Sequence, residues 1–190
     1  MQYQEVAGGI CAPKGFAAAG VHCGIRANHN EKYDLALIKA EVRCAAAGVY
    51  TTNKVCGAPI KVDRAHLKDG YAQAILVNSG NANTCAANGV ALAEECCGLV
   101  GEALHIPAED VLPASTGVIG QPMVIDPFAR GIPAAAAKLA ATAIMTTDTH
   151  KKEYAIQFEL GGKTCTVGAI GKGSGCLLYT SDAADDHRLV

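Results

Sequence analysis

Three short apolar runs of this chain lead directly into polar loops, and this arrangement limits the folds open to it. The clearest run, residues 74–77, is followed by Asn-Ser-Gly-Asn-Ala-Asn-Thr at residues 78–84. The other polar loops are residues 115–120 and 146–149, and a fourth, glycine-rich loop is residues 171–175. A rigid strand aims the polar groups that follow it, and glycine lets a ligand approach the backbone. Each loop alone is typical of an ordinary turn, but the four together favour a binding site.

The patterning between these loops predicts a layered α/β or α+β fold. The glycine pair at residues 161–162 predicts a two-residue hairpin. Apolar residues at three- and four-residue steps across residues 89–104 predict an amphipathic helix. Further strands are expected at residues 34–38, 46–51, 74–77, 154–160 and 163–170, and further helices at residues 63–68 and 134–143.

Composition sets the character of the core and excludes some functions. The 190 residues suit one domain or an incomplete piece of a larger one, and hydrophobic residues make up 50% of them. With no Trp, 5% aromatic residues and 21 Gly, the core must form by close packing of small residues. A formal charge of -2 argues against charge-driven binding of nucleic acid.

The cysteines predict free thiols. Their number is nine, and none falls in a Cys-x-x-Cys spacing, so neither a disulfide framework nor a zinc ribbon is indicated. Cys96 and Cys97 are interpreted as small buried hydrophobes. His22 beside Cys23 is only a weak candidate for an activated thiolate. The six His show no spacing that indicates a metal site.

No targeting or membrane segment is expected. The first nine residues lack a basic start followed by an apolar stretch, and no run reaches the roughly 18 apolar residues of a membrane helix. The chain is therefore expected to be a cytoplasmic protein without a membrane partner.

One of the loops carries the donors needed for acyl transfer. Thr116 offers a hydroxyl and Gly117 an unobstructed backbone N–H, the two kinds of donor that stabilise a tetrahedral oxyanion. The loop has no nucleophile of its own. Lys172, between two glycines, can hold a substrate carboxylate or remain solvated, and Thr146 or Thr147 can add a hydroxyl. No phosphate-binding P-loop, Gly-x-Gly-x-x-Gly or Gly-x-Ser-x-Gly motif is present.

In their order along the chain, these motifs resemble the ornithine acetyltransferase family, also called bifunctional glutamate N-acetyltransferase, of arginine biosynthesis. The resemblance extends over residues 1–175. It is carried by Gly-Gly-Ile at residues 8–10, Pro-Lys-Gly-Phe at 13–16, Asp-Leu-Ala-Leu-Ile at 34–38, Ala-Gly-Val-Tyr-Thr-Thr-Asn at 47–53, Ala-Pro at 58–59, and the segments 77–83, 115–120, 143–149 and 171–175.

The resemblance implies an acyltransferase of the ornithine acetyltransferase and N-terminal-threonine aminopeptidase-like fold. Such a precursor cuts itself before a threonine, and this threonine becomes the nucleophile at the start of a second, β-chain. Acetyl then moves from N2-acetyl-L-ornithine to L-glutamate through an acetyl-threonine, and bifunctional members also use acetyl-CoA. In this chain Thr116 and Gly117 would form the oxyanion hole, and Thr146 and Lys172 would contact substrate. The family precedent is an α2β2 assembly in the cytoplasm without a resident cofactor or metal.

The resemblance stops at Gly175. The family continues with Met-Ile, Pro and an Ala-Thr cleavage pair, whereas residues 176–190 here are unrelated and resemble the translation of a sequencing-library adapter. Thr180 follows Tyr179 rather than Ala, so it is not assigned as the nucleophile. Residues 1–175 are therefore interpreted as the α-chain portion, truncated and inactive without its nucleophile and β-chain. A short genuine C-terminal segment is the alternative for residues 176–190.

Two other functions stay open on the sequence alone. One is a self-cleaving threonine aminopeptidase of the related fold, which would hydrolyse short peptides instead of transferring acetyl. The other is a non-catalytic module whose glycine-rich loops hold a small carboxylate.

Overall fold

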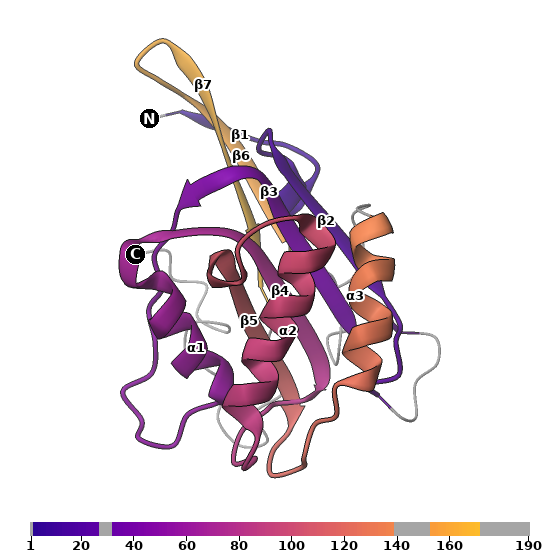
Figure 1. Ribbon diagram of the computed structural model, residues 1–190. Helices are drawn as coiled ribbons and strands as arrows, with labels where there is room; N and C mark the ends of the chain where they lie inside the picture. The colour runs from indigo at the N-terminus through magenta and orange to yellow at the C-terminus, as the bar shows by residue number, and fades with distance from the viewer. Residues whose placement is uncertain (1, 27–31, 139–152, 172–190) are drawn as a thin grey trace. The chain divides into compact units, whose positions relative to one another are not determined.

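The computed structural model describes residues 2–26, 32–138 and 153–171 (Figure 1). The chain divides into two compact units. The larger unit is Gly15–Ile144, and the smaller one combines Met1–Lys14 with Met145–Val190.

The larger unit is built on a four-stranded sheet with the order β2-β3-β4-β5. The strands are β2 (Phe16–Val21), β3 (Leu35–Ala45), β4 (Tyr71–Asn81) and β5 (Val111–Val118). The first three strands pair antiparallel, and β5 pairs parallel to β4. Because parallel neighbours need a crossover, the chain passes from β4 to β5 through a helix.

Three helices lie on one face of this sheet (Figure 1). They are α1 (Ala58–His66), the crossover helix α2 (Gly89–Leu104) and α3 (Asp126–Lys138), with short 3₁₀ turns η2 (Leu67–Asp69) and η3 (Ala108–Asp110). The core between helices and sheet is fully buried at Leu37, Val100 and Ile132. Phe128 is the one aromatic residue among the described members of this core, so aliphatic side chains fill most of it.

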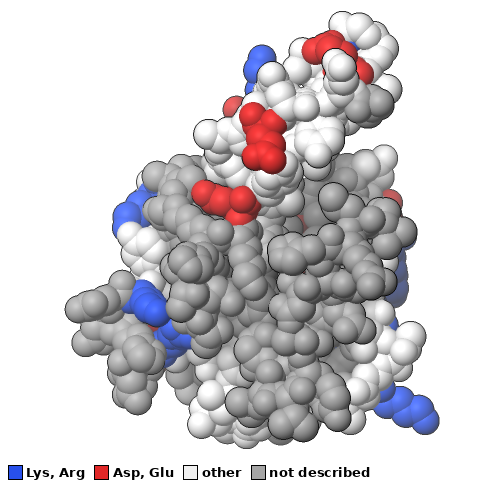
Figure 2. Space-filling view, turned by 180° about the vertical axis from the view of Figure 1, so that it is seen from behind, with Lys and Arg blue, Asp and Glu red and all other residues white. Residues whose placement is uncertain are grey.

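The smaller unit contains a three-stranded antiparallel sheet of order β1-β6-β7. Its strands are β1 (Tyr3–Glu5), β6 (Glu153–Leu160) and β7 (Lys163–Ile170), and a 3₁₀ turn, η1 (Gly9–Cys11), belongs to the same unit. Acidic side chains gather on this unit's surface (Figure 2). Its described acidic residues are Glu5, Glu153 and Glu159.

Several sequence predictions are confirmed. The mixed α/β class is correct, and α2 has the predicted bounds with Cys96 and Cys97 buried in its apolar face. Gly161 and Gly162 form the predicted hairpin turn with φ values of 59° and 74°. These two features depend on local sequence only, through helical periodicity and turn chemistry.

Other predictions are wrong. Residues 46–51 form no strand; Val49 is fully exposed, and β3 instead extends to Ala45. The helix expected at residues 63–68 begins at Ala58, since Pro59 suits a first helical turn. The helix expected at residues 134–143 begins at Asp126 and contains Pro133, while residues 139–143 lie outside the described part. Neither β1 nor β2 was expected.

Candidate functional site

Two of the four predicted polar loops come together at the carboxyl ends of β4 and β5. The parallel register pairs Asn78 with Ser115 and continues to Asn81 with Val118. Both strands therefore extend into segments that the sequence predicted as loops. Asn78 does not end β4, and Ser115 does not end β5. The carboxyl end of parallel strands is where ligands bind in open α/β sheets.

The two strand ends approach closely at a pair of glycines. Gly80 and Gly117 are register partners with φ values of 113° and 138°, a region that favours glycine. A Cβ atom on Gly117 would lie 2.3 Å from the carbonyl carbon of Gly80 and 2.5 Å from the nitrogen of Asn81. No other residue fits position 117 without moving the backbone. The neighbouring Thr116 is partly exposed and Gly117 is exposed, so both residues reach the surface at this strand end.

Buried amide side chains support this strand end from within. Ser115 Oγ donates to Asn78 Oδ1 at 2.6 Å, and Asn78 Nδ2 donates to Asn81 O at 2.9 Å. Asn81 Nδ2 in turn donates to Gln121 O at 3.0 Å, and its Oδ1 accepts the backbone N–H of Asn83 at 2.8 Å. These hydrogen bonds connect the end of β4 to β5 and to the segments that follow the two strands. They hold the backbone of Gly117 in place.

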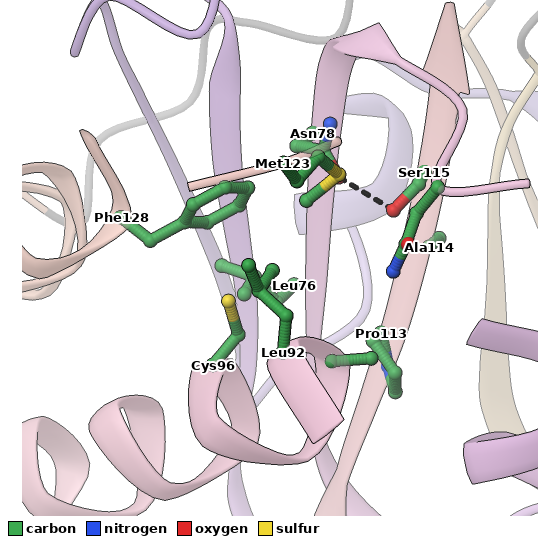
Figure 3. Close-up of a pocket in the computed structure, with 11 residues that line it drawn as sticks. Leu76, Asn78, Leu92, Cys96, Pro113, Ala114, Ser115, Met123 and Phe128 are labelled. Atoms are coloured by element: carbon green, nitrogen blue, oxygen red, sulfur yellow. Dashed lines mark hydrogen bonds between the residues drawn. The ribbon is translucent and has the colours of Figure 1, made fainter. Parts of the chain in front are cut away.

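A small cavity lies between this network and the helices (Figure 3). It has room for about one water molecule. Leu76, Leu92 and Phe128 give it apolar walls, and Asn78 and Ser115 line its polar end. Its size excludes an amino-acid substrate, so the cavity belongs to the support of the strand end.

The predicted substrate contacts fall outside the described residues. Thr146 and Lys172 both lie there, as do residues 176–190 with Thr180. Of the predicted loop at residues 171–175, only Gly171 is described. The structure therefore brings together Thr116, Gly117 and the loop at residues 78–84, and it leaves the roles of the other predicted residues as predictions.

Cys23 is not an activated nucleophile. Burial, with a further contribution from the Asp34 carboxylate, raises the pKa of its thiol to about 12. Asp34 is 2% exposed and accepts the backbone N–H groups of Cys23, Gly24 and Arg26 at 2.7, 3.1 and 3.1 Å. His22 Nδ1 lies 3.1 Å from the same carboxylate. His22 and Asp34 thus shape the loop after β2 instead of activating a thiol.

Burial also raises the pKa of two further internal thiols and of one carboxyl group. It raises the pKa of the Cys97 thiol to about 12 and that of the Cys96 thiol further. In α1, burial raises the pKa of Asp63 to about 7, and its Oδ1 has no hydrogen-bond partner. All eight cysteines in the described ranges are free thiols.

The sequence reasoning missed Ser79 and Asn81 as individual residues. Ser79 is 4% exposed, and its Oγ has no hydrogen-bond partner. The sequence signal for this loop was the density of short polar residues directly after an apolar strand. That signal identified the loop but not which of its residues are buried. Burial on both faces of a strand end is a property of packing, and only the structure shows it.

Neither metal ligands nor membrane spans are found where the chain is described. Residues 2–26, 32–138 and 153–171 contain no group of three His, Cys, Asp or Glu side chains arranged for a metal ion. None of the helices in these ranges is long and apolar enough to cross a membrane.

Comparison with known proteins identifies close relatives. A model of the ArgJ family matches residues 17–179. The arginine biosynthesis bifunctional protein ArgJ of Symbiobacterium thermophilum is 47% identical, and the match covers 95% of this chain and 49% of that protein. The protein of the same name from Caldanaerobacter subterraneus is 44% identical, and the match covers 90% of this chain and 43% of that protein. The chain thus spans about half the length of these relatives.

Solved structures share the fold over nearly their whole length. The crystal structure of arginine biosynthesis bifunctional protein ArgJ from Bacillus halodurans has a TM-score of 0.84 and 36% identity, with 95% of this chain and 97% of that chain covered. The ornithine acetyltransferase of Mycobacterium tuberculosis, solved in complex with ornithine, has a TM-score of 0.83 and 35% identity. The match covers 95% of this chain and 99% of that chain.

Proposed function

The chain belongs to the ArgJ family, and from this premise we propose that its residues 1–175 are the α-chain portion of a glutamate N-acetyltransferase. The complete enzyme moves the acetyl group of N2-acetyl-L-ornithine to L-glutamate in arginine biosynthesis. The proposal is supported by the Gly80–Gly117 pair, which puts Thr116 and Gly117 at the carboxyl end of two parallel strands, where ligands bind in open α/β sheets. Paired hydroxyl and N–H donors suit the oxyanion of acyl transfer.

The proposed nucleophile is a threonine beyond residue 175, freed by cleavage of the precursor. Its hydroxyl adds to the acetyl carbon of acetylornithine, and its proton passes to the threonine's own amine. The bond between the acetyl carbon and the ornithine nitrogen breaks, and ornithine leaves with that proton. The neutral glutamate amine then attacks the acetyl-threonine ester, and the bond between the acetyl carbon and the threonine oxygen breaks. The proton lost by the glutamate nitrogen passes through the threonine amine to that oxygen. Thr116 and Gly117 stabilise the oxyanion in both steps.

The relation between the two sets of relatives supports a two-chain enzyme. This chain covers 49% of the Symbiobacterium thermophilum protein but 97% of the solved Bacillus halodurans chain. A precursor that is cut near its middle accounts for both values. We propose a β-chain as the partner, in an α2β2 assembly of the cytoplasm, with acetyl-CoA as a further acetyl donor. Thr146 and Lys172 are the proposed substrate contacts, since a lysine pairs with a substrate carboxylate as a point charge.

The test uses a completed precursor, in which residues 1–175 are followed by the carboxyl-terminal half of the Symbiobacterium thermophilum relative. We expect two fragments after expression, the second beginning with threonine, and transfer of labelled acetyl from acetylornithine to glutamate. Residues 1–190 alone are expected to be inactive. Thr116→Ala should lower kcat by about 10²–10³-fold, whereas Thr116→Ser keeps the hydroxyl and most of the activity.

The same assay distinguishes the other two functions. Hydrolysis of short peptides without acetyl transfer would replace the proposal by an aminopeptidase. Saturable binding of acetylornithine or glutamate by residues 1–190 in calorimetry, with no turnover by the processed protein, would replace it by a carboxylate-binding module.

A further inference from the structure

A buried hydroxyl without a hydrogen bond stands beside the proposed oxyanion donors. Ser79 is 4% exposed, and its Oγ has no partner. Its backbone is held in place, because its N–H donates to Asp34 O at 2.8 Å. Buried polar groups in native proteins are nearly always satisfied, and an exception calls for an explanation such as a catalytic role.

The register places Ser79 next to Thr116. The two residues are partners in the parallel β4–β5 ladder, so their side chains project from the same face of the sheet. The preceding pair, Asn78 and Ser115, projects from the opposite face and closes a hydrogen bond of 2.6 Å. One face therefore carries a satisfied pair, and the other carries two side-chain hydroxyls without a hydrogen bond to the described part of the chain.

The small cavity does not account for Ser79. That cavity is lined by Asn78 and Ser115, on the helix-covered face, and Ser79 is not among its lining residues. A water molecule in the cavity would leave the Ser79 hydroxyl unsatisfied. On its own face, the register partner of Ser79 in the described part of the chain is Thr116, whose side chain also carries a hydroxyl.

We propose that Ser79 is a positioning residue for acyl transfer, acting through Thr116. A hydroxyl has one proton to donate and two lone pairs to accept with. When Thr116 donates its proton to the oxyanion, Ser79 O–H donates to Thr116 Oγ1, which fixes the rotamer of Thr116 and strengthens its donation. The Ser79 hydroxyl is thus satisfied only when the site is occupied. This inference rests on the proposed function.

A double-mutant cycle in the completed precursor tests the proposal. Ser79→Ala is expected to lower kcat about tenfold with KM unchanged, and Thr116→Ala about 100-fold or more. Because Ser79 acts through Thr116, the double variant should be no slower than Thr116→Ala within a factor of about two. Ser79→Thr keeps a hydroxyl and should retain kcat within about twofold, whereas Ser79→Cys, with a weak donor, should lose several-fold.

Ser115→Ala is the matched control for stability. It removes a satisfied hydroxyl from the neighbouring strand position and should lower the melting temperature by about 2–4 °C. Ser79→Ala removes an unsatisfied hydroxyl, so its melting temperature should equal or exceed that of the parent. A lower melting temperature for Ser79→Ala would mean that the hydroxyl has a structural partner, which contradicts the proposal.

The outcomes separate this proposal from the function on which it depends. If the processed parent transfers no acetyl group, the proposed function fails and this inference falls with it. If the parent is active and Ser79→Ala has the parental kcat, only the role of Ser79 is refuted. Multiplicative losses in the double variant, near 1000-fold, would also refute it, since Ser79 would then act independently of Thr116.

Discussion

The two ends of the β4–β5 pair are stabilised by opposite kinds of chemistry. At the amino end, Arg43 donates to the 2% exposed Asp110 at 2.7 and 2.9 Å and to Asp69, and its guanidinium lies 4.8 Å from the centre of the Tyr71 ring. At the carboxyl end the Asn78 side chain bonds, among the described residues, only to the neutral groups Ser115 Oγ and Asn81 O, and the Ser79 hydroxyl has no partner. The amino end is thus joined by ion pairs, whereas the carboxyl end is joined by neutral hydrogen bonds and keeps one buried hydroxyl without a partner.

The largest expected effect is at the carboxyl end, from Gly117→Ala. The new Cβ would lie 2.3 Å from the backbone of Gly80 at a φ of 138°, so the strand ends must separate. We expect a loss of roughly 2–4 kcal/mol in the free energy of unfolding and more than 100-fold in acetyl transfer. Gly120→Ala is the control, because its φ is 78° but no atom lies within 4 Å, and it should lose about 1 kcal/mol. Equal losses in denaturant unfolding would contradict the close approach.

A smaller effect is expected from Asn81→Ala at the same end. This change removes the bond to Gln121 O and leaves the buried backbone N–H of Asn83 without its acceptor. The loss should be about 2 kcal/mol, measured by denaturant unfolding. Asn88→Ala is the matched control, since Asn88 is exposed and its bond to Met123 O is 3.4 Å long, and it should lose less than about 0.5 kcal/mol.

The elements that depend on local sequence were predictable, and the pairings between strands far apart in the sequence were not. Helix α2 follows from the spacing of Ala93, Cys97 and Val100, and the β6–β7 turn follows from its two glycines. The segment at residues 46–51 has strand-forming residues but pairs with no strand in the described part of the chain, so its prediction failed. Strand formation depends on partners far along the chain, which a single sequence does not reveal.

The same limit applies to the site. Thr116 and Gly117 were identified as candidate donors because a hydroxyl and a glycine follow an apolar strand. That Gly80 faces Gly117, and that Ser79 is buried beside Thr116, depends on the β4–β5 register. A shift of one residue would place these side chains on the other face, and the loop composition would look the same.

The third prediction concerns the pH dependence of stability near the start of β5. Helix α1 packs there through the contact of His66 Nδ1 with Val111 O at 2.8 Å. Asp63 of this helix loses its proton near pH 4 when unfolded but only near pH 7 when folded. The folded state therefore holds more protons between these values, and stability falls as pH rises through the window. Allowing for its partial exposure, the loss should be about 1 kcal/mol.

Asp63→Asn should remove this slope, as melting curves between pH 5 and 8 would show. A parent whose stability rises over the same interval would contradict the assignment, since Asp63 would then have an ionised partner in the folded state.

The smallest expected effect is at the exposed part of the charged end. The hydrogen bond from Arg43 lowers the pKa of Asp69, but the pair is open to solvent, so Asp69→Asn should lower the melting temperature only slightly. In 1 M NaCl this difference should vanish. Asp110→Asn should keep most of its effect in salt, because the Asp110 carboxylate is buried. Equal salt sensitivity of both variants would show that this end depends on long-range charge and not on the buried contact.

The pairing of Tyr3 with Phe158 sets an order of events during synthesis. At roughly 5–20 residues per second, β1 emerges from the ribosome on the order of ten to thirty seconds before β6. The four strands and three helices described for the larger unit lie between these two strands in sequence. The larger unit can therefore fold while the first strand still waits for its partner. A ribosome that stalls before β6 releases a chain with a complete four-stranded sheet and an unpaired β1, a ready substrate for chaperones and proteases.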